Sequence, residues 1–323
     1  MKVFWDKIKK PFFCLAPMAD VTDVAFRQMF AKYGKPDVTW TEFVSADGLA
    51  SEGVRVLKYD LMFSEKERPV VVQLFGSNKE KMRQAAKMCA LLGFDGIDIN
   101  MGCPDRSIEK QGAGAALIKD KKRAVEIVEA ARQGILDSGK KVGLSVKTRI
   151  GYDKNEIEEW VPILLSLDLD ALTIHARTRK QMSLVDADWK YVKRVVEIRN
   201  SMKLKTKIIG NGDVVSIEDG LSKCKESGCD GVMVGRGVFG SPWFFYGKEP
   251  TLKKRLKILV EHTKLFEKKL GRIKSFSVMK KHYKAYVNGF EGAKELRMEL
   301  MEAKDSKEVS DIIKSFITKN RLK

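Results

Sequence analysis

Short apolar runs that end in polar or turn-forming residues recur along the first three quarters of the chain. These runs predict strands at Phe12–Ala16, Val38–Phe43, Val70–Phe75, Gly96–Asn100, Lys141–Lys147, Ala171–His175, Lys207–Gly210 and Gly231–Gly235. Between them, apolar residues at helical spacing predict helices at Asn78–Leu92, Ala124–Ile135, Trp160–Leu167, Trp189–Ile198 and Ile217–Cys224. Strands that alternate with helices pair in parallel, and eight such units predict a closed (β/α)8 TIM barrel.

After Pro250 the pattern changes to helices with no strand between them. The predicted helices are Leu252–Leu270, Val278–Val287, Glu295–Glu302 and Val309–Ile317. We therefore expect a barrel domain over residues 1–247 and a small helical domain over residues 251–323. An open doubly wound sheet is the rival fold, but the GxGxxG turn expected near its first strand is missing.

Composition narrows the class of protein. A chain of 323 residues in which 44% are hydrophobic and 32% charged is typical of a soluble globular protein. No apolar run is long enough to span a membrane, and no signal peptide follows Met1, so we expect a cytoplasmic location. The five cysteines do not resemble a disulfide framework, and Cys224 with Cys229 lacks the partners of a zinc site.

The net charge of +18 is concentrated in one segment. Residues 251–284 hold twelve Lys or Arg residues against two Glu residues, a net of +10. Such a cluster favours an acidic polymer, most simply a nucleic acid, as the partner. The alternative is a lysine-rich solvated surface of the kind found in heat-adapted proteins.

Polar residues follow nearly every predicted strand, and in a barrel these ends converge on one face. They are Ala16–Ala19, Glu42, Gln73, Asn100 with Cys103, Lys147 with Arg149, His175 with Arg177, Asn211–Asp213 and Gly235–Gly237. We expect an active site there. The glycine-bearing turns at the last two strands, with Arg236, favour a phosphorylated cofactor. Lys147 could form a Schiff base, bind phosphate or donate to an electron-rich ring, and Cys103 is either a reactive thiol or a small buried hydrophobe.

Eight motifs together resemble the tRNA-dihydrouridine synthases, flavoenzymes that reduce a uridine in tRNA. The motifs are Ala16–Asp23, Gln73–Gly76, Ile99–Pro104, Gly112–Leu117, Lys147–Arg149, His175–Arg179, Asn211–Asp213 and Gly235–Gly237. They stand in the family's order and cover roughly residues 11–245. The helical tail is similar to the family's RNA-binding domain.

The resemblance implies FMN at the barrel mouth, reduced by NADPH. Its implied cofactor residues are Pro17, Met18 and Ala19 against the ring system, Gln73, Lys147 and His175 at the ring edge, and Asn211, Gly212, Asp213, Gly235 and Arg236 near the phosphate. Cys103 would donate a proton to C5 of the uracil, and Asn100 would position the base. Arg177 and Arg179 would contact phosphate or base. A monomer with tRNA as partner and no metal is expected.

One segment departs from the family pattern, and other functions stay open. Lys180–Asp188 replaces an aromatic or glycine-bearing segment, so contacts to the base or tRNA there are not predicted. The nearest alternative function is an FMN-dependent barrel oxidoreductase acting on a small pyrimidine or enone. A non-catalytic tRNA-binding protein and a Schiff-base aldolase using Lys147 are the others.

Overall fold

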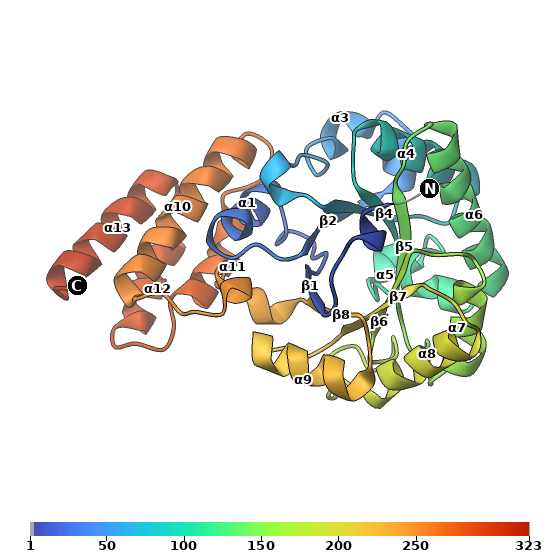
Figure 1. The fold of residues 1–323 in the computed structure, drawn as a ribbon. Coiled ribbons are helices and arrows are strands. Elements are labelled where there is room, and N and C mark those ends of the chain that lie inside the picture. Colours follow the sequence, from blue (N-terminus) through green and yellow to red (C-terminus); the bar gives the residue numbers. More distant parts are fainter. Residues whose placement is uncertain (1–2, 323) are drawn as a thin grey trace.

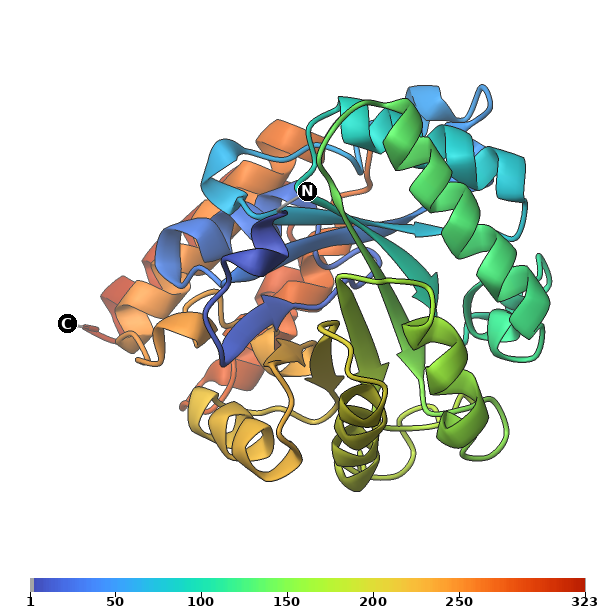
Figure 2. The same cartoon turned by 45° about the vertical axis from the view of Figure 1, so that its right-hand side comes forward.

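The computed structural model describes residues 3–322 and contains the predicted barrel. Its strands are β1 (Phe12–Leu15), β2 (Val38–Ser45), β3 (Val70–Phe75), β4 (Gly96–Met101), β5 (Gly143–Arg149), β6 (Ala171–His175), β7 (Lys207–Asn211) and β8 (Gly231–Val234). All neighbours are parallel, and β1 pairs with both β2 and β8, which closes the sheet (Figures 1 and 2). The predicted fold class is confirmed.

Helices surround the barrel and continue beyond it. They are α1 (Val24–Tyr33), α2 (Ala46–Leu49), α3 (Val54–Leu57), α4 (Lys79–Leu91), α5 (Arg106–Glu109), α6 (Lys121–Asp137), α7 (Ile157–Leu165), α8 (Lys190–Ser201), α9 (Ile217–Ser227), α10 (Leu252–Leu270), α11 (Ser277–Tyr286), α12 (Ala293–Glu302) and α13 (Ser306–Lys319). Every helix predicted from periodicity is present. The periodicity did not predict α1, whose buried residues lie on more than one side; α1 packs against α10 and against the short helix at Glu65–Glu67.

Short polar side chains fix where several helices begin. Asp23, Asn78, Asp120, Ser216 and Asp305 precede α1, α4, α6, α9 and α13, and each accepts a hydrogen bond from a backbone N–H of the first turn. These contacts satisfy N–H groups that have no partner within the helix. These five side chains therefore set where their helices begin.

The amino-terminal end of the barrel is closed by aromatic packing. Trp5, which precedes β1, contacts Phe12 and Trp40 with ring centroids 5.9 Å apart in both cases. Gly143 at the start of β5 makes room for it, since a Cβ there would lie 2.7 Å from the Trp5 ring. Apolar side chains thus fill this end, and polar side chains gather toward the opposite, carboxyl end of the strands.

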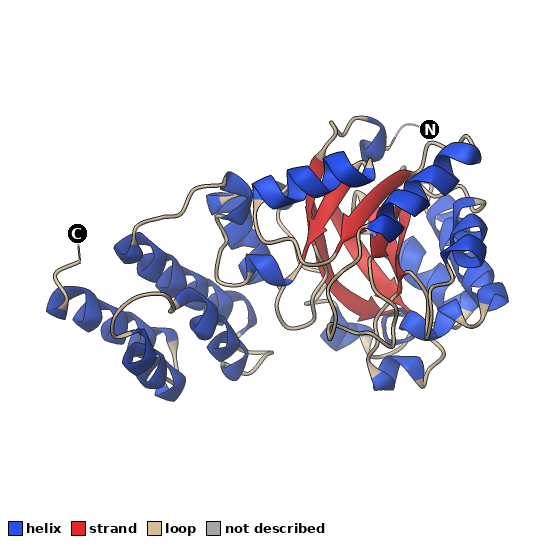
Figure 3. Cartoon of the chain, turned by 90° about the horizontal axis from the view of Figure 1, so that it is seen from below, coloured by secondary structure: helices blue, strands red, loops and turns tan. Residues whose placement is uncertain are grey.

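The last four helices form a group at one side of the barrel (Figure 3). α10 packs on α1, where the rings of Phe26 and His262 stack with centroids 4.9 Å apart. Tyr33 Oη also donates to Glu261 at 2.5 Å. α11 adds His282, whose ring lies edge-on to Phe26. The division into domains at residues 247 and 251 stays a prediction, although no strand occurs after β8 among the described residues.

Candidate active site

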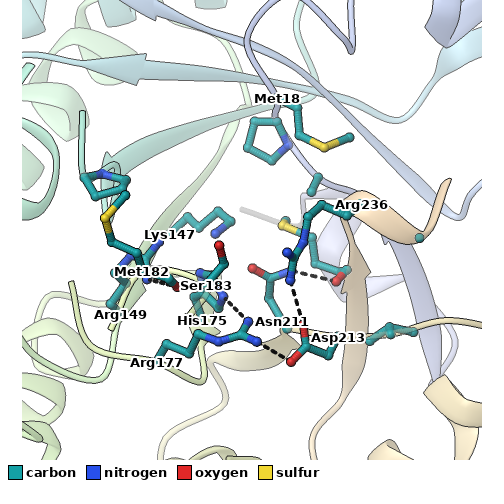
Figure 4. A pocket seen from close by; sticks show the side chains of 18 of the residues that line it. Met18, Lys147, Arg149, His175, Arg177, Met182, Ser183, Asn211, Asp213 and Arg236 are labelled. Carbon is teal, nitrogen blue, oxygen red and sulfur yellow. Dashed lines mark hydrogen bonds and ion pairs between the residues drawn. The ribbon is translucent and has the colours of Figure 1, made fainter. Parts of the chain in front are cut away.

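A cavity of about 740 Å³ opens at the carboxyl ends of the strands. It is lined by Ala16, Pro17, Met18, Pro104, Lys147, Arg149, His175, Arg177, Met182, Ser183, Asn211, Gly212, Asp213, Val214, Val215, Met233, Gly235, Arg236 and Gly237. Figure 4 shows the basic side chains on one side facing Met18 and Arg236 across the opening. The volume lies in the range of small-molecule and cofactor sites. Most of the residues predicted from the strand ends therefore meet at one cavity.

Cys103 lies on a short loop immediately after β4. The side-chain oxygen of Asn100 accepts hydrogen bonds from the backbone N–H groups of Gly102 at 3.0 Å and Cys103 at 2.9 Å. Cys103 is half-buried, and burial raises the pKa of its thiol. The thiol therefore keeps its proton at neutral pH and can act as an acid. Its neighbour Pro104 lines the cavity.

A hydrogen-bonded chain runs beneath the cavity and supports this loop. Asn100 Nδ2 donates to Gln73 Oε1 at 2.9 Å, and Gln73 Nε2 donates to Asp98 Oδ2 at 2.6 Å. Ser145 Oγ donates to the other Asp98 oxygen at 2.5 Å. Because side chains two residues apart on a strand share a face, Asp98 and Asn100 point to the same side of β4. Gln73 and Asn100 are buried and lie outside the cavity lining.

Arg149 was predicted on the active-site face without a specific role, and it braces the same loop. Its Nε donates to the carbonyl of Gly102 at 2.7 Å, and Nη1 donates to the carbonyls of Thr178 at 3.0 Å and Met182 at 3.3 Å. Burial lowers its pKa to about 10, so it stays charged at neutral pH. One buried cation thereby joins the loop after β4 to the loop after β6.

Lys147 and His175 line the cavity side by side with Arg149 in Figure 4. Within residues 3–322, Lys147 Nζ has no hydrogen-bond or ion-pair partner; burial, followed by the charge of Arg149, lowers its pKa to about 8. Burial and the nearby cations lower the pKa of His175 well below its ordinary value, so its ring is neutral. His175 Nε2 lies 3.3 Å from Arg177 Nη1 and accepts from that permanently charged donor.

Asp213 joins two arginines at the other side of the opening. It accepts from Arg177 Nη2, from Arg236 Nη2 at 2.8 Å and from the backbone N–H of Ala187 at 2.8 Å. Burial opposes ionisation of Asp213, but these hydrogen bonds lower its pKa below the ordinary value. Asp213 thus holds Arg236, whose side chain is 62% exposed, at the cavity edge.

Two arginines proposed from the sequence have contacts that were not predicted, and Ala19 has a position that was not predicted. Arg177 is buried and donates to Asp213, to His175 and to the carbonyl of Val185, so its polar atoms are occupied. Arg179 makes a bidentate contact with Glu109 and also donates to the carbonyl of Pro104 at 3.3 Å. Ala19 lies outside the cavity lining. These arginines brace loops around the cavity.

The comparison with known families decides the relationship. Residues 14–321 match the family model described as "Dihydrouridine synthase (Dus)". The chain belongs to the dihydrouridine synthase family. The match continues through α10–α13, beyond the residues that carry the recognised motifs.

Relatives of this dihydrouridine synthase family member align over nearly their whole length. The probable tRNA-dihydrouridine synthase of Staphylococcus aureus (strain MRSA252) is 38% identical over 319 residues, which cover 97% of this chain and 95% of the relative. The probable tRNA-dihydrouridine synthase 2 of Bacillus subtilis (strain 168) is 37% identical over 319 residues, covering 97% of this chain and 96% of the relative.

Solved structures share the barrel fold. Histamine dehydrogenase from Rhizobium sp. 4-9 matches with a TM-score of 0.54 at 14% identity, covering 78% of this chain and 48% of that chain. A 2-naphthoyl-CoA reductase matches with a TM-score of 0.53 at 11% identity, covering 72% of this chain and 49% of that one. This dihydrouridine synthase family member thus spans about half the length of each.

Dihydrouridine synthases are flavin-dependent oxidoreductases, and the cavity of this member fits a flavin. Pro17, Met18 and Met233 supply apolar surface for a flat ring system. Lys147 offers a cation that no described residue pairs with. At Gly235 an added Cβ would be in ordinary van der Waals contact with Ala16 and Met18, at 3.7 Å and 3.8 Å, and Gly235 lines the cavity next to Arg236.

Two classes of feature are absent from residues 3–322. No helix there is long and apolar enough to cross a bilayer. In the same residues, no group of three or more His, Cys, Asp or Glu side chains is placed to hold a metal ion.

Proposed function

We propose that this protein reduces the C5–C6 double bond of a uridine in tRNA. The position of Cys103 carries the proposal: a protonated thiol stands on a braced loop beside a cavity that fits a flavin. The two relatives named as probable tRNA-dihydrouridine synthases, which align over 95% and 96% of their length, support tRNA as the substrate.

The cofactor is FMN, re-reduced by NADPH. The residues that would hold it are Pro17 and Met18 at the ring system, Lys147 and His175 at the ring edge, and Asn211, Gly212, Asp213, Gly235 and Arg236 at the phosphate, whereas Ala19 and Gln73 lie outside the cavity lining. When bound, FMN would supply the hydride that C6 of the uracil receives. Gln73 and Asp213 contribute indirectly, because Gln73 is engaged with Asp98 and Asn100 while Asp213 holds Arg236.

The protein's own residues supply the proton and the positioning. Cys103 Sγ gives its proton to C5, and the buried side chain of Asn100 holds the loop on which that thiol stands. Lys147 places a positive charge beside the reacting rings, where negative charge develops. Arg177 and Arg179 act by bracing the surrounding loops. The target base must leave its stack to reach this cavity.

The helical region provides affinity for the tRNA backbone. Residues 251–284 carry a net charge of +10, and phosphate neutralisation by such a segment makes binding strongly salt-dependent. We take residues 1–247 as the catalytic domain and 251–323 as the tRNA-binding domain of a monomer. The site of action is the cytoplasm, where tRNA is found.

The test is direct. The purified protein should show flavin absorbance and, with NADPH, form dihydrouridine in an unmodified tRNA transcript. Cys103→Ala should retain the flavin and its reduction by NADPH but lose tRNA turnover. A flavin-loaded protein that reduces a free pyrimidine or an enone and leaves tRNA unchanged would refute the proposal.

A further inference from the structure

Three apolar side chains are exposed within four consecutive residues at the cavity edge. Leu184 is 84% exposed, Val185 46% and Met182 43%. Scattered apolar residues on a surface need no explanation, but a compact group beside a binding cavity marks a contact surface. Met182 and Ser183 line the cavity, and Leu184 and Val185 follow directly. We call Met182, Leu184 and Val185 the apolar rim.

The backbone of the apolar rim is held from below by buried cations. Arg149 Nη1 donates to the carbonyl of Met182 at 3.3 Å, and Arg177 Nε donates to the carbonyl of Val185 at 2.6 Å. Both arginines are buried, at 6% and 2% exposure. Leu184 N–H is also bonded, to the carbonyl of Gln181 at 2.9 Å. The segment therefore presents its apolar side chains to solvent from a fixed backbone.

The apolar rim is tied to the proton donor. Arg149 binds the carbonyl of Gly102, the residue before Cys103, and the carbonyl of Met182 with the same guanidinium. Figure 4 shows Met182 beside Arg149, on the side of the cavity opposite Arg236. The apolar rim therefore lies at the edge of the cavity and is linked through Arg149 to the loop that carries Cys103.

We propose that the apolar rim packs against the face of a nucleobase next to the extruded uridine. This inference rests on the proposed function. Extrusion of one base uncovers the faces of its neighbours, and proteins commonly cover such faces with Leu, Met or Phe side chains. The occupant is an RNA base because the exposed Lys180 beside the rim suits a phosphate, whereas Leu184 offers no charge or hydrogen bond.

The test compares Leu184→Ser with Leu184→Phe. The serine variant should raise KM for tRNA about tenfold, because the loss of one base-face contact has an effect of this order. The phenylalanine variant should restore wild-type KM, because a flat apolar ring also covers a base face. Reduction of bound flavin by NADPH should be unchanged in both. The slope of log Kd for tRNA against log salt should also match wild type, since no phosphate contact is lost.

Leu136→Ser is the matched control, because Leu136 is 61% exposed on α6 and lies outside the cavity lining. It should leave KM for tRNA unchanged. An unchanged KM in Leu184→Ser, or a changed salt slope, would overturn the proposal. Loss of flavin or a raised KM for NADPH would also overturn it, by assigning the rim to a cofactor. Val185→Ser is a second test variant. It removes another apolar side chain of the rim but keeps the backbone carbonyl that accepts from Arg177. Failure of the wild-type enzyme on tRNA would instead refute the proposed function.

Discussion

The carboxylate of Asp98 fixes the orientation of the Gln73 side-chain amide, because it accepts a 2.6 Å hydrogen bond from Gln73 Nε2. With its nitrogen engaged, Gln73 presents Oε1 to Asn100 Nδ2 at 2.9 Å. The oxygen of Asn100 is then turned toward the backbone N–H of Cys103. A buried carboxylate thus sets the position of the proton donor through two amides.

Asp98→Asn should slow tRNA turnover about tenfold. In metal sites, removing a partner that orients a ligand costs roughly 10- to 100-fold, and we expect the lower end of that range here. The new amide can donate or accept, so it no longer fixes the orientation of Gln73. Because Asp98 also raises the pKa of Lys147 through its charge, any alkaline limb due to Lys147 should move to lower pH. Single-turnover rates across pH measure both effects. Wild-type rates and limbs in this variant would contradict the role.

Turnover should fall at alkaline pH as the Cys103 thiol loses its proton. A proton donor is active below its pKa and inactive above it, and burial places this pKa above the ordinary thiol value of about 8.5. Cys103→Ser should remove this fall, because a hydroxyl does not ionise in the range, and should lower the rate by roughly 10²–10⁴. A fall in turnover near pH 8 that remains in the serine variant would be due to deprotonation of Lys147.

Lys274→Met should destabilise the protein by about 3–5 kcal/mol. Lys274 Nζ lies 3.0 Å from Glu42 Oε2 and 3.1 Å from Asp60 Oδ1, and the Glu42 side chain is 7% exposed. Removing the cation leaves a buried carboxylate without its counter-charge. Adding Glu42→Gln should recover part of the loss. Denaturant unfolding of the wild type, the two single variants and the double variant measures the coupling free energy between Lys274 and Glu42. Additive changes in stability would contradict this coupling.

The protein should lose stability as pH falls below about 6.5. Burial lowers the pKa of His282 to about 3 and that of His262 well below its ordinary value. Both rings are neutral when folded but bind protons when unfolded, so their contribution is complete above pH 6.5. It decreases toward pH 3 by about 1.4 kcal/mol per pH unit for each ring.

His282→Phe isolates the contribution of one of these rings. Both nitrogens of His282 are buried without hydrogen-bond partners among the described residues. A phenylalanine ring should therefore be tolerated at pH 7 and should reduce the acid loss by the contribution of one histidine. Thermal unfolding between pH 7 and pH 5 provides the measurement. Equal slopes for the variant and wild type would contradict the assignment.

The strands were predictable because those of a parallel barrel are buried on both faces and read as nearly continuous apolar runs. β3 and β6 begin and end at the predicted residues, and the other strands differ by at most two at either end. α1 was not predicted, because burial on several sides removes the one-sided stripe that marks a surface helix. Four-residue helices such as α5 are too short for any periodicity.

The sequence was enough to predict which strand ends meet at the site. Lys147, His175 and Arg236 line one cavity because parallel strands deliver their carboxyl ends to the same face. The sequence does not show whether a polar atom is already engaged within the protein, as it is in Arg177. Asp98 was missed because it stands inside an apolar run, where only its inward register, two residues before Asn100, marks it.

The packing of α10 on α1 joins the beginning of the chain to its last quarter. Phe26 and Phe30 lie against rings that arrive more than two hundred residues later, on His262 and Phe245. During synthesis on the ribosome, the aromatic face of α1 therefore stays uncovered until the chain through α10 has been made. A nascent or truncated chain ending before α10 is the form most exposed to aggregation and most in need of a chaperone.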